Sequence, residues 1–405
     1  IFVDLRERSG MVQVVFSSEM HQEVFTKAES IRSEFVLAVK GVVKTRAAET
    51  VNPKMATGEI EVYCNELRIL NKAKTPPFYI QDGIDVDEML RLKYRYLDLR
   101  RPEMQRNLML RHRVTKVMRD FPDKQGFVEI ETPMLTKSTP EGARDYLVPS
   151  RSNPGKFFAL PQSPQIFKQI LMVAGYEKYF QIVRCFRDED LRADRQPEFT
   201  QLDIEMSFID DEDILGMMED MTVQMFKEGI DADIKAPFKR LTYAEAMDKY
   251  GSDKPDLRFE MELVNLSEAV KGSDFKVFES VIQSGGEVKA INVKNYANIA
   301  RRELDGLVDY VGIYGAKGLA WIQYTEEGIK SPITKFFSEE IINNITATTK
   351  AETGDLILII ADKPAVVAQA LGELRLEMAR RLNLIDEDKL SFLWVVDFPM
   401  FEYNE

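Results

Sequence analysis

Charged and amide side chains alternate with apolar ones along residues 181–205, which hold the densest set of groups able to bind a ligand. We predict two strands joined by a charged loop, and on the second strand a period of two separates the side chains onto opposite faces. The set expected to face a core is Thr200, Leu202, Ile204, Met206 and Phe208. The opposite, polar face carries Phe199, Gln201, Asp203, Glu205 and Ser207. With Arg187 and Glu189 of the first strand, this face suits a ligand that carries both a cation and anions.

Arg187 is the candidate phosphate ligand of this segment. The chain contains neither of the two common glycine-rich phosphate motifs, GxxxxGKS/T and GxGxxG. Bound phosphates must therefore be held by guanidinium groups, whose planar fork can engage two oxygens at once. The alternative for Arg187 is a structural ion pair with Asp188, Glu189 or Asp203.

Two segments upstream could complete a binding site. The loop 139–145 places Glu141 beside a glycine. Residues 159–169 put a polar turn between two prolines at the start of a helix, where Gln165 and Lys168 are spaced to share one helical face. A buried ammonium at Lys168 could bind a carboxylate; the alternative is a solvated lysine on a first helical turn.

Composition indicates a globular, multidomain protein. The chain has 405 residues, 44% of them hydrophobic and 30% charged, which favours two to four domains. No apolar run approaches the roughly 18 residues that span a bilayer. Two cysteines and two histidines make a disulfide framework, a CxxC metal site or a histidine cluster improbable, and we expect a reducing cytoplasm.

The charge is distributed unevenly. A net charge of −13 argues against broad, non-specific nucleic-acid binding. Residues 91–119 nevertheless hold ten Lys or Arg against only Asp98 and Glu103. We expect this run to be a solvated helix face, and a local nucleic-acid contact is the alternative.

The order of the expected elements suggests several domains. Strands at 1–5, 11–16, 35–44 and 60–70 around a helix at 22–33 fit a small barrel of the OB type, a common platform for single-stranded nucleic acid. A linker near 74–83 precedes helices at 87–99 and from Pro102, a strand at 127–131, and helices at 211–229 and 243–250. From about 258 the pattern is mixed α/β until a strand at 392–396, which predicts one domain inserted into another.

Five segments together resemble a known family. Residues 131–135 (ETPML), preceded by a long helix, look like motif 1 of class II aminoacyl-tRNA synthetases, and residues 186–205 look like motif 2. The strings TPEGARDY at 139–146, LPQSPQ at 160–165 and RCFRDEDLRADRQPEFTQ at 184–201 resemble the bacterial-type aspartyl-tRNA synthetases. The resemblance covers essentially the whole chain, and motif 2 with the Gln-Ser-Pro-Gln turn is its most specific part.

The resemblance implies an α+β protein with an antiparallel class II catalytic sheet flanked by helices, an N-terminal OB-type barrel and an inserted α+β domain. The implied boundaries are 1–73 for the anticodon-binding barrel, 74–104 for the hinge, 105–257 for the catalytic domain, 258–390 for the insertion and 391–405 for the return to the catalytic domain. Both chain ends look cut. The Gly-rich motif 3, a second substrate arginine, the acidic Mg²⁺ ligands and a histidine loop are therefore expected after Glu405, with no metal ligands inside the chain.

The resemblance also implies a role for each candidate residue. Around the aspartate substrate, Glu141 would sense the ammonium from a mobile loop, Gln165 and Asp203 would surround the same ammonium, and Lys168 would pair with the side-chain carboxylate. Arg187 would bridge the aspartate carboxylate and the α-phosphate of ATP. The ATP site would be completed by Asp188, Glu189 and Gln196, with stacking of adenine on Phe199. In the barrel, anticodon bases would be stacked and read by Phe2 and Gln13.

The implied activity is aspartate–tRNA ligation in two steps, with Mg²⁺ accompanying ATP. Aspartate attacks the α-phosphorus of ATP to give aspartyl-adenylate and pyrophosphate, and a terminal ribose hydroxyl of tRNA then accepts the aspartyl group. The implied assembly is a cytoplasmic homodimer without a membrane segment, joined through the motif 1 helix and the strand near Pro133. Asparaginyl- and lysyl-tRNA synthetases are alternatives that Lys168 disfavours. A tRNA-binding or scaffolding relative without catalysis is the alternative from another class.

Overall fold

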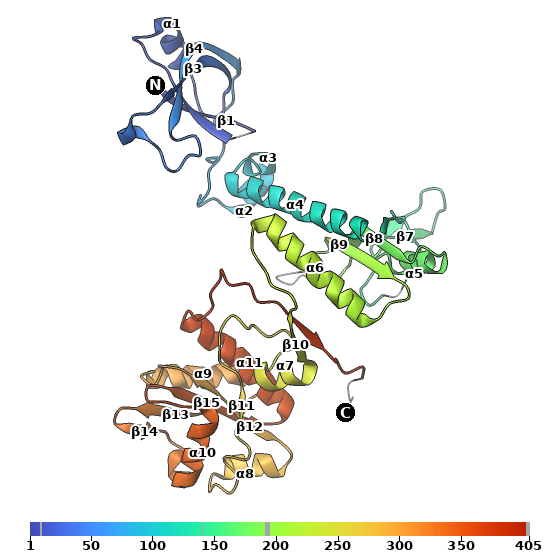
Figure 1. The fold of residues 1–405 in the computed structure, drawn as a ribbon, viewed down its shortest axis with the longest axis vertical. Helices are drawn as coiled ribbons and strands as arrows, with labels where there is room; N and C mark the ends of the chain where they lie inside the picture. The colour runs from blue at the N-terminus through green and yellow to red at the C-terminus, as the bar shows by residue number, and fades with distance from the viewer. Residues whose placement is uncertain (9, 140, 191–194, 402–405) are drawn as a thin grey trace. The chain divides into compact units, whose positions relative to one another are not determined.

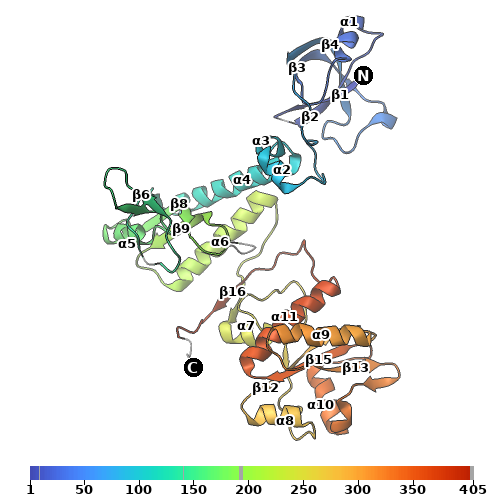
Figure 2. The same ribbon diagram turned by 180° about the vertical axis from the view of Figure 1, so that it is seen from behind.

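The computed structural model describes residues 1–8, 10–139, 141–190 and 195–401 (Figures 1 and 2). The chain forms two compact units, residues 1–113 and 114–405. Pro140 and residues 191–194, the middle of the predicted charged loop, lie outside the described residues. Among the described helices, none combines the length and apolar composition that crossing a membrane requires.

The N-terminal part of the first unit is a small β-domain with one helix. Its elements are β1 (Phe2–Glu7), β2 (Gly10–Val15), α1 (Gln22–Ala28), β3 (Val36–Thr45), the 3-10 turn Ala48–Thr50 and β4 (Ile60–Asn71). The sheet order is β1-β2-β4-β3, with β2 and β4 parallel and the other two pairings antiparallel. Inward side chains of alternate strand positions bury a core with α1, as a period of two requires: Val14, Phe16, Ala28, Cys64 and Leu67.

A glycine allows β3 to bend across β4. The β3–β4 register shifts between Lys40 and Gly41. A Cβ atom at position 41 would lie 2.3 Å from the carbonyl oxygen of Tyr63, so no larger residue fits without moving the backbone. The bulge is one of the devices by which a short sheet curls into a barrel-like domain.

Three helices follow: α2 (Glu88–Lys93), α3 (Arg95–Asp98) and α4 (Pro102–Lys124). Asp87 caps α2, because its carboxylate accepts hydrogen bonds from the backbone N–H groups of Met89 (2.9 Å) and Leu90 (3.3 Å). The single helix expected at 87–99 is wrong, since the backbone leaves the helical region at Tyr94 (φ −109°, ψ 43°).

The basic run between these helices surrounds a buried carboxylate. Asp98 is fully buried and contacts the guanidinium groups of Arg91 (3.9 Å), Arg101 (2.8 Å) and Arg95. The expectation of a plain solvated face is therefore wrong for Arg101, which is buried, whereas Arg91 and Arg95 contact Asp98 and stay partly exposed. An unpaired buried carboxylate would be costly, so the arginines serve the packing of the three helices.

The second unit contains the predicted two-stranded segment. Its strands are β8 (Lys178–Phe186) and β9 (Glu198–Met206), which pair antiparallel, and β5 (Val128–Glu129) joins β8 in parallel. The helix α5 (Gln165–Val173) packs on the hairpin, and α6 (Asp211–Ile230) runs beside it (Figures 1 and 2). A short antiparallel ribbon, β6 (Leu147–Pro149) and β7 (Phe157–Ala159), precedes α5.

The two faces of β9 differ from the expected division. Leu202, Ile204 and Met206 are only half-buried on the face expected to be core, and Thr200 is exposed. Phe208 is 94% exposed, because β9 ends at Met206 and the backbone turns to φ 59° at Phe208. The polar face, in contrast, holds the most buried residue of the strand, Asp203.

The rest of the second unit is an α/β segment between two paired strands. The strands β10 (Lys239–Thr242) and β16 (Leu393–Val396) are parallel neighbours, and α7 (Tyr243–Tyr250) follows β10. The chain thus returns to the same place after about 150 residues, as counted from these strand bounds. The intervening elements are β11 (Val264–Asn265), α8 (Lys276–Gln283), β12 (Glu287–Val293), α9 (Arg301–Ile313), β13 (Ala320–Thr325), β14 (Gly328–Lys330), the 3-10 turn Thr334–Phe336, α10 (Glu339–Thr349), β15 (Leu356–Asp362) and α11 (Pro364–Arg381).

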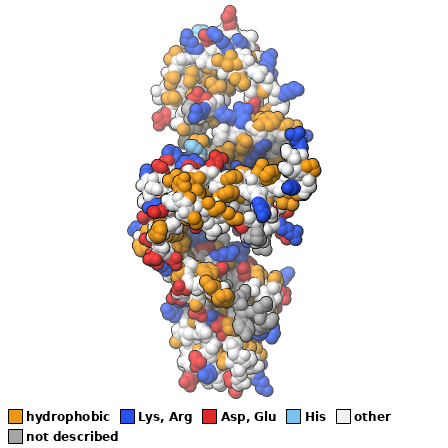
Figure 3. All heavy atoms as spheres, turned by 90° about the vertical axis from the view of Figure 1, so that its right-hand side faces the viewer, with side chains coloured by type: hydrophobic (Ala, Val, Ile, Leu, Met, Phe, Trp, Pro, Cys, Tyr) orange, Lys and Arg blue, Asp and Glu red, His pale blue; other side chains and the backbone are white. Residues whose placement is uncertain are grey.

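The sheet of this segment has the order β11-β12-β15-β13-β14, with every pairing antiparallel. Both faces are covered: α9 and α11 bury one core with Ile291, Leu356 and Leu358, and α8 and α10 bury another with Ile357 and Ile359. Successive residues of β15 therefore point into different cores, which explains its continuous apolar run. On the face shown in Figure 3, acidic and basic side chains are interspersed.

Candidate active site

The β8–β9 register aligns the candidate residues on one face. Cys185 lies opposite Phe199, and Gln181 lies opposite Asp203. Phe199 and Asp203 are four residues apart on the same face of β9, a distance of about 13 Å along a strand. Arg187 follows the end of β8 and hydrogen-bonds through its N–H to the carbonyl of Pro197 at 2.9 Å. The hairpin thus presents one elongated polar surface.

Lys168 of α5 contacts two carboxylates of β9. Its Nζ lies 2.9 Å from Asp203 Oδ1 and 3.3 Å from Glu205 Oε2. Burial lowers the pKa of Lys168, but the hydrogen bond and charge of Asp203, with those of Glu205, outweigh burial and raise it. The alternative of a solvated lysine is wrong, because the Lys168 side chain is only 13% exposed.

Asp203 is left with an unused oxygen. Its Oδ1 is bound by Lys168, whereas Oδ2 is buried and has no hydrogen-bond partner among the described residues. Burial raises the pKa of Asp203, and the ammonium of Lys168 opposes this shift without cancelling it. A buried acceptor without a donor is costly. The carboxylate is therefore prepared to receive a further N–H or O–H group.

Glu141 lies against the polar turn before α5. One carboxylate oxygen accepts a hydrogen bond from Ser163 Oγ at 2.7 Å, and the other from Thr139 Oγ1 at 3.4 Å. The same turn holds the loop through buried Gln162, whose amide bonds both backbone groups of Ala143 at 2.9 and 3.1 Å.

Gln162 also bonds Asp145, at 2.5 Å. Burial raises the pKa of Asp145, but the hydrogen bonds from Ser138 and Gln162 outweigh burial and lower it. The loop is therefore tied to the turn through an ionised carboxylate.

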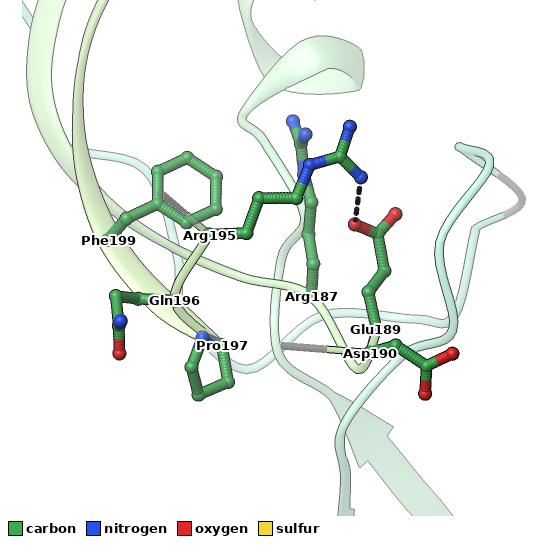
Figure 4. A pocket seen from close by; sticks show the side chains of 7 residues that line it. All are labelled: Arg187, Glu189, Asp190, Arg195, Gln196, Pro197 and Phe199. Atoms are coloured by element: carbon green, nitrogen blue, oxygen red, sulfur yellow. Dashed lines mark hydrogen bonds and ion pairs between the residues drawn. The ribbon is translucent and has the colours of Figure 1, made fainter. Parts of the chain in front are cut away.

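A pocket of about 400 Å³ opens at the other end of the hairpin (Figure 4). The guanidinium of Arg187 lies 5.1 Å from the centre of the Phe199 ring, and Arg195 bonds Glu189 at 3.1 Å. In Figure 4 the amide of Gln196 points away from these charged groups. The described lining residues are Arg187, Glu189, Asp190, Arg195, Gln196, Pro197 and Phe199.

Among the residues that the structure describes, no carboxylate lies within ion-pair distance of Arg187. The alternative role of Arg187, a structural ion pair, is therefore not observed among these residues. Asp188, a predicted ATP ligand, bonds through its backbone N–H to the carbonyl of Arg144 at 3.0 Å. Gln165 begins α5, one turn before Lys168. The structure therefore gathers the predicted aspartate and ATP residues around one hairpin, with Asp188 attached to the 139–145 loop.

The two predicted anticodon residues belong to the first unit. Phe2 pairs with Val15, and Gln13 lies two residues before Val15 on the face of β2 opposite the core residue Val14. Phe2 is 68% exposed. Diagonal neighbours of this kind are close enough for an aromatic ring and an amide to contact the same base.

The sequence matches the family described as tRNA synthetases class II (D, K and N) over residues 87–404, and an OB-fold nucleic acid binding domain over residues 1–70. It is 65% identical to an aspartate–tRNA(Asp/Asn) ligase from Heliobacterium modesticaldum, over 100% of this chain and 67% of that protein. It is 59% identical to an aspartate–tRNA ligase from Ruminiclostridium cellulolyticum, over 100% and 68%. The chain belongs to the aspartate–tRNA ligase family.

Solved structures agree at the level of fold. An asparaginyl-tRNA synthetase from Pyrococcus horikoshii, complexed with asparaginyl-adenylate, has a TM-score of 0.53 at 19% identity and covers 96% of this chain and 92% of its own. An Entamoeba histolytica asparaginyl-tRNA synthetase has the same TM-score at 18% identity, over 92% and 88%. The predicted aspartyl-tRNA synthetase resemblance, class II fold and ligase class are confirmed, and the alternative without catalysis is not favoured.

Sequence reasoning missed several residues of this aspartate–tRNA ligase site. Glu205 was visible on the alternating face of β9, and Ser163 in the Gln-Ser-Pro-Gln turn, although neither received a role. Tyr179 and Gln181 received no role either, because the sequence of β8 does not show which residues of other segments they meet. Their positions follow only from strand pairing.

The described residues do not offer a ready metal site. Among them, no group of three or more His, Cys, Asp or Glu side chains is placed to hold a metal ion. The residues described here therefore do not fit a resident metal, and no step of the reaction is assigned to one.

Proposed function

We propose that this protein activates L-aspartate with ATP and transfers the aspartyl group to the 3′ end of tRNA. The observation that carries the proposal is the buried Lys168–Asp203 pair on the same hairpin as Arg187 and Phe199. An amino acid with one cation and two carboxylates needs acceptors and donors side by side. The family membership supports the same reaction.

In the aspartate pocket, the ammonium of the substrate would be held by Asp203, Gln165 and Glu141. The orphaned Asp203 Oδ2 supports this role, because it offers a buried acceptor. Lys168 would bind the side-chain carboxylate. Its ammonium has three N–H groups, of which Asp203 and Glu205 engage two among the described residues. Asparagine would offer the third N–H no carboxylate, and the ammonium of a lysine substrate would be repelled by Lys168.

In the ATP pocket, adenine would stack on Phe199, and Asp188, Glu189 and Gln196 would line the site. Arg187 would contact both the reacting carboxylate of aspartate and the α-phosphate. Its position supports this role, because its guanidinium lies 5.1 Å from the centre of the Phe199 ring, and Asp203 lies about 13 Å further along the same face of β9. Charge grows on the α-phosphate during in-line attack, and a preoriented guanidinium stabilises it.

Magnesium would arrive with ATP as the nucleotide's counter-ion. When bound, it supplies charge neutralisation of the phosphates. The protein residues proposed above bind and orient the two substrates.

The barrel at 1–73 would bind the anticodon through Phe2 and Gln13, joined by the hinge 74–104 to the catalytic domain at 105–257 and 391–405. The pairing of β10 with β16 supports treating 258–390 as an insertion. We also propose a cytoplasmic homodimer joined through α4 and the strand leading to Pro133, by analogy with motif 1.

Aspartate-dependent ATP–pyrophosphate exchange by the intact protein tests the proposal. Arg187→Ala is expected to abolish exchange, because the other guanidinium that lines this pocket, that of Arg195, is paired with Glu189. Arg184→Ala is the matched control: Arg184 lies on the opposite face of β8 and pairs with Glu198. Undiminished exchange in Arg187→Ala, or equal loss in both variants, would refute the assigned role.

Amino-acid and tRNA choice are tested separately. Exchange should depend on aspartate and not on asparagine or lysine. Charging of purified tRNA for aspartate and tRNA for asparagine then decides between the two specificities that the names of the relatives contain. Exchange supported by asparagine or lysine as well as by aspartate would contradict the role of Lys168.

A further inference from the structure

A group of buried polar side chains lies beneath the ammonium site. Tyr179 and Gln181 of β8 are 0% and 6% exposed, and Thr132, just after β5, is 7% exposed. Burial of a hydroxyl or amide is costly unless each is hydrogen-bonded. None of these three side chains has a role in the proposed reaction so far.

The Gln181 amide has one orientation that satisfies both of its ends. In that orientation its nitrogen donates to Tyr179 OH at 2.9 Å, to Thr132 Oγ1 at 3.0 Å and to the Ile130 carbonyl at 3.3 Å. Its oxygen accepts from the Thr132 backbone N–H at 3.3 Å. In the opposite orientation the hydroxyls of Thr132 and Tyr179 would donate to the amide oxygen at 3.0 and 2.9 Å, but that oxygen would also face the Ile130 carbonyl, and the amide nitrogen would face the Thr132 N–H. The network therefore determines which atom of Gln181 faces Tyr179.

This orientation leaves the phenolic proton of Tyr179 free to bond elsewhere. The phenol oxygen accepts from Gln181, so its O–H must find another acceptor in a buried environment. Gln181 lies opposite Asp203, and Tyr179 lies two residues earlier on the same face, which makes Tyr179 and Asp203 diagonal neighbours. Asp203 Oδ2 is the buried acceptor without a partner among the described residues. A carboxylate oxygen can accept two hydrogen bonds, so Oδ2 can take the phenol O–H and still accept from the ammonium of the substrate.

The electrostatics agree with this pairing. Burial, and then the negative charge of Asp203, raise the pKa of Tyr179, so the phenol stays protonated at neutral pH. A protonated phenol is a donor that a buried carboxylate can use.

We propose that Tyr179 is a positioning residue for the reaction: its O–H donates to Asp203 Oδ2 and is oriented by Gln181 and Thr132. The inference rests on the proposed function, in which Asp203 binds the ammonium of aspartate. It adds that the orientation of Asp203 depends on residues that never touch the substrate. Thr132 belongs to the segment before Pro133, so the chain of hydrogen bonds runs from the motif 1 segment to the amino-acid pocket.

Tyr179→Phe in the intact protein removes only the phenol oxygen. The KM for aspartate in ATP–pyrophosphate exchange should rise about ten-fold or more, the change expected when a hydrogen bond to a charged group is lost. The KM for ATP should stay within about two-fold, because the adenine site lies at the other end of the hairpin. Tyr250→Phe is the matched control, since it removes a buried phenol that donates to the carboxylate of Glu262 at 2.8 Å.

The pH profile separates positioning from a general loss of structure. The groups facing Asp203 are Lys168 of α5, Glu205 of β9, and Tyr179 and Cys185 of β8. Loss of the phenol donor raises the pKa of Asp203 further, so the acid limb of kcat/KM for aspartate should move to higher pH in Tyr179→Phe. The profile of Tyr250→Phe should match that of the wild type.

Gln181→Met tests the same inference if Tyr179→Phe folds poorly, because it keeps the phenol of Tyr179 and removes the amide that orients it. Like Tyr179→Phe, it should raise the KM for aspartate and leave the KM for ATP unchanged. The inference is overturned if both variants keep the wild-type KM for aspartate and the wild-type acid limb. It is also overturned if the KM values for aspartate and ATP rise equally. A wild-type protein without aspartate-dependent exchange would instead refute the proposed function.

Discussion

Replacement of Lys168 by methionine is the most direct test of the amino-acid pocket. Methionine keeps an unbranched side chain of similar length and removes the charge. In the structure this leaves Asp203, whose side chain is 3% exposed, without the ammonium that lies 2.9 Å away. Removal of one partner of a buried ion pair costs about 3–5 kcal/mol. Lys168 is also the proposed ligand of the substrate carboxylate.

The same energy sets the expected loss of activity. If the cost appears in binding of aspartate, kcat/KM for aspartate should fall by between about a hundred-fold and a few thousand-fold. The assay is aspartate-dependent ATP–pyrophosphate exchange, with the KM for ATP measured in parallel. Lys178→Met is the control, because Lys178 lies at the start of β8, where its ammonium bonds the Gln125 carbonyl at 3.2 Å and lies 5.7 Å from the centre of the Phe127 ring. A KM for aspartate within about three-fold of wild type would refute the reasoning.

The stability of Lys168→Met should depend on pH with a defined sign. Burial already raises the pKa of Asp203, and loss of Lys168 raises it further. A folded-state pKa above the unfolded value means that the folded variant binds the proton more tightly, so its stability falls as pH rises through that interval. The deficit in Tm relative to wild type should therefore shrink from about pH 8 to about pH 5. A deficit that grows on acidification would contradict an unpaired Asp203.

Three further variants test other parts of the structure. Phe199→Leu should raise the KM for ATP about ten-fold through lost stacking, and an unchanged KM for ATP in the exchange assay would exclude the adenine role. Asp98→Asn should lower the Tm, because three arginines lose their buried counter-ion; urea unfolding should show a loss of about 3–5 kcal/mol, and a wild-type midpoint would contradict it. Phe2→Leu should raise the KM for tRNA in aminoacylation by about five-fold or more, and an unaltered value would remove Phe2 from the anticodon site.

Local patterns were read correctly where a short stretch determines its own geometry. The alternation along β9 identified the face that carries Phe199 and Asp203, because side chains of a strand alternate whatever surrounds them. The helix 243–250 is observed with the predicted bounds, since Thr242 and Glu245 form a capping box and Gly251 adopts the left-handed conformation that ends it. Each of these signals depends only on residues that are close together in the sequence.

Predictions failed where the outcome depended on what covers a residue. Phe208 was assigned to a core by extending the period-two alternation of β9, yet it follows the end of that strand and is exposed. The arginines around Asp98 looked like a solvated run, because a sequence shows the charge but not the carboxylate it encloses. The break at Tyr94 divides a segment whose composition is helical throughout.

The sequence by itself determined the family and the inventory of chemistry: a motif 2 hairpin with arginine, acids and amides, a lysine one turn into a helix, and a barrel-like N-terminal domain. Only the tertiary structure decided which of these groups meet. Lys168 and Asp203 are 35 residues apart, and their contact exists because α5 packs on β9. The placement of Gln181 against Thr132 and Tyr179 likewise follows from strand register. Burial, pairing and the resulting pKa shifts belong to surroundings that distant segments create, so a local pattern cannot encode them.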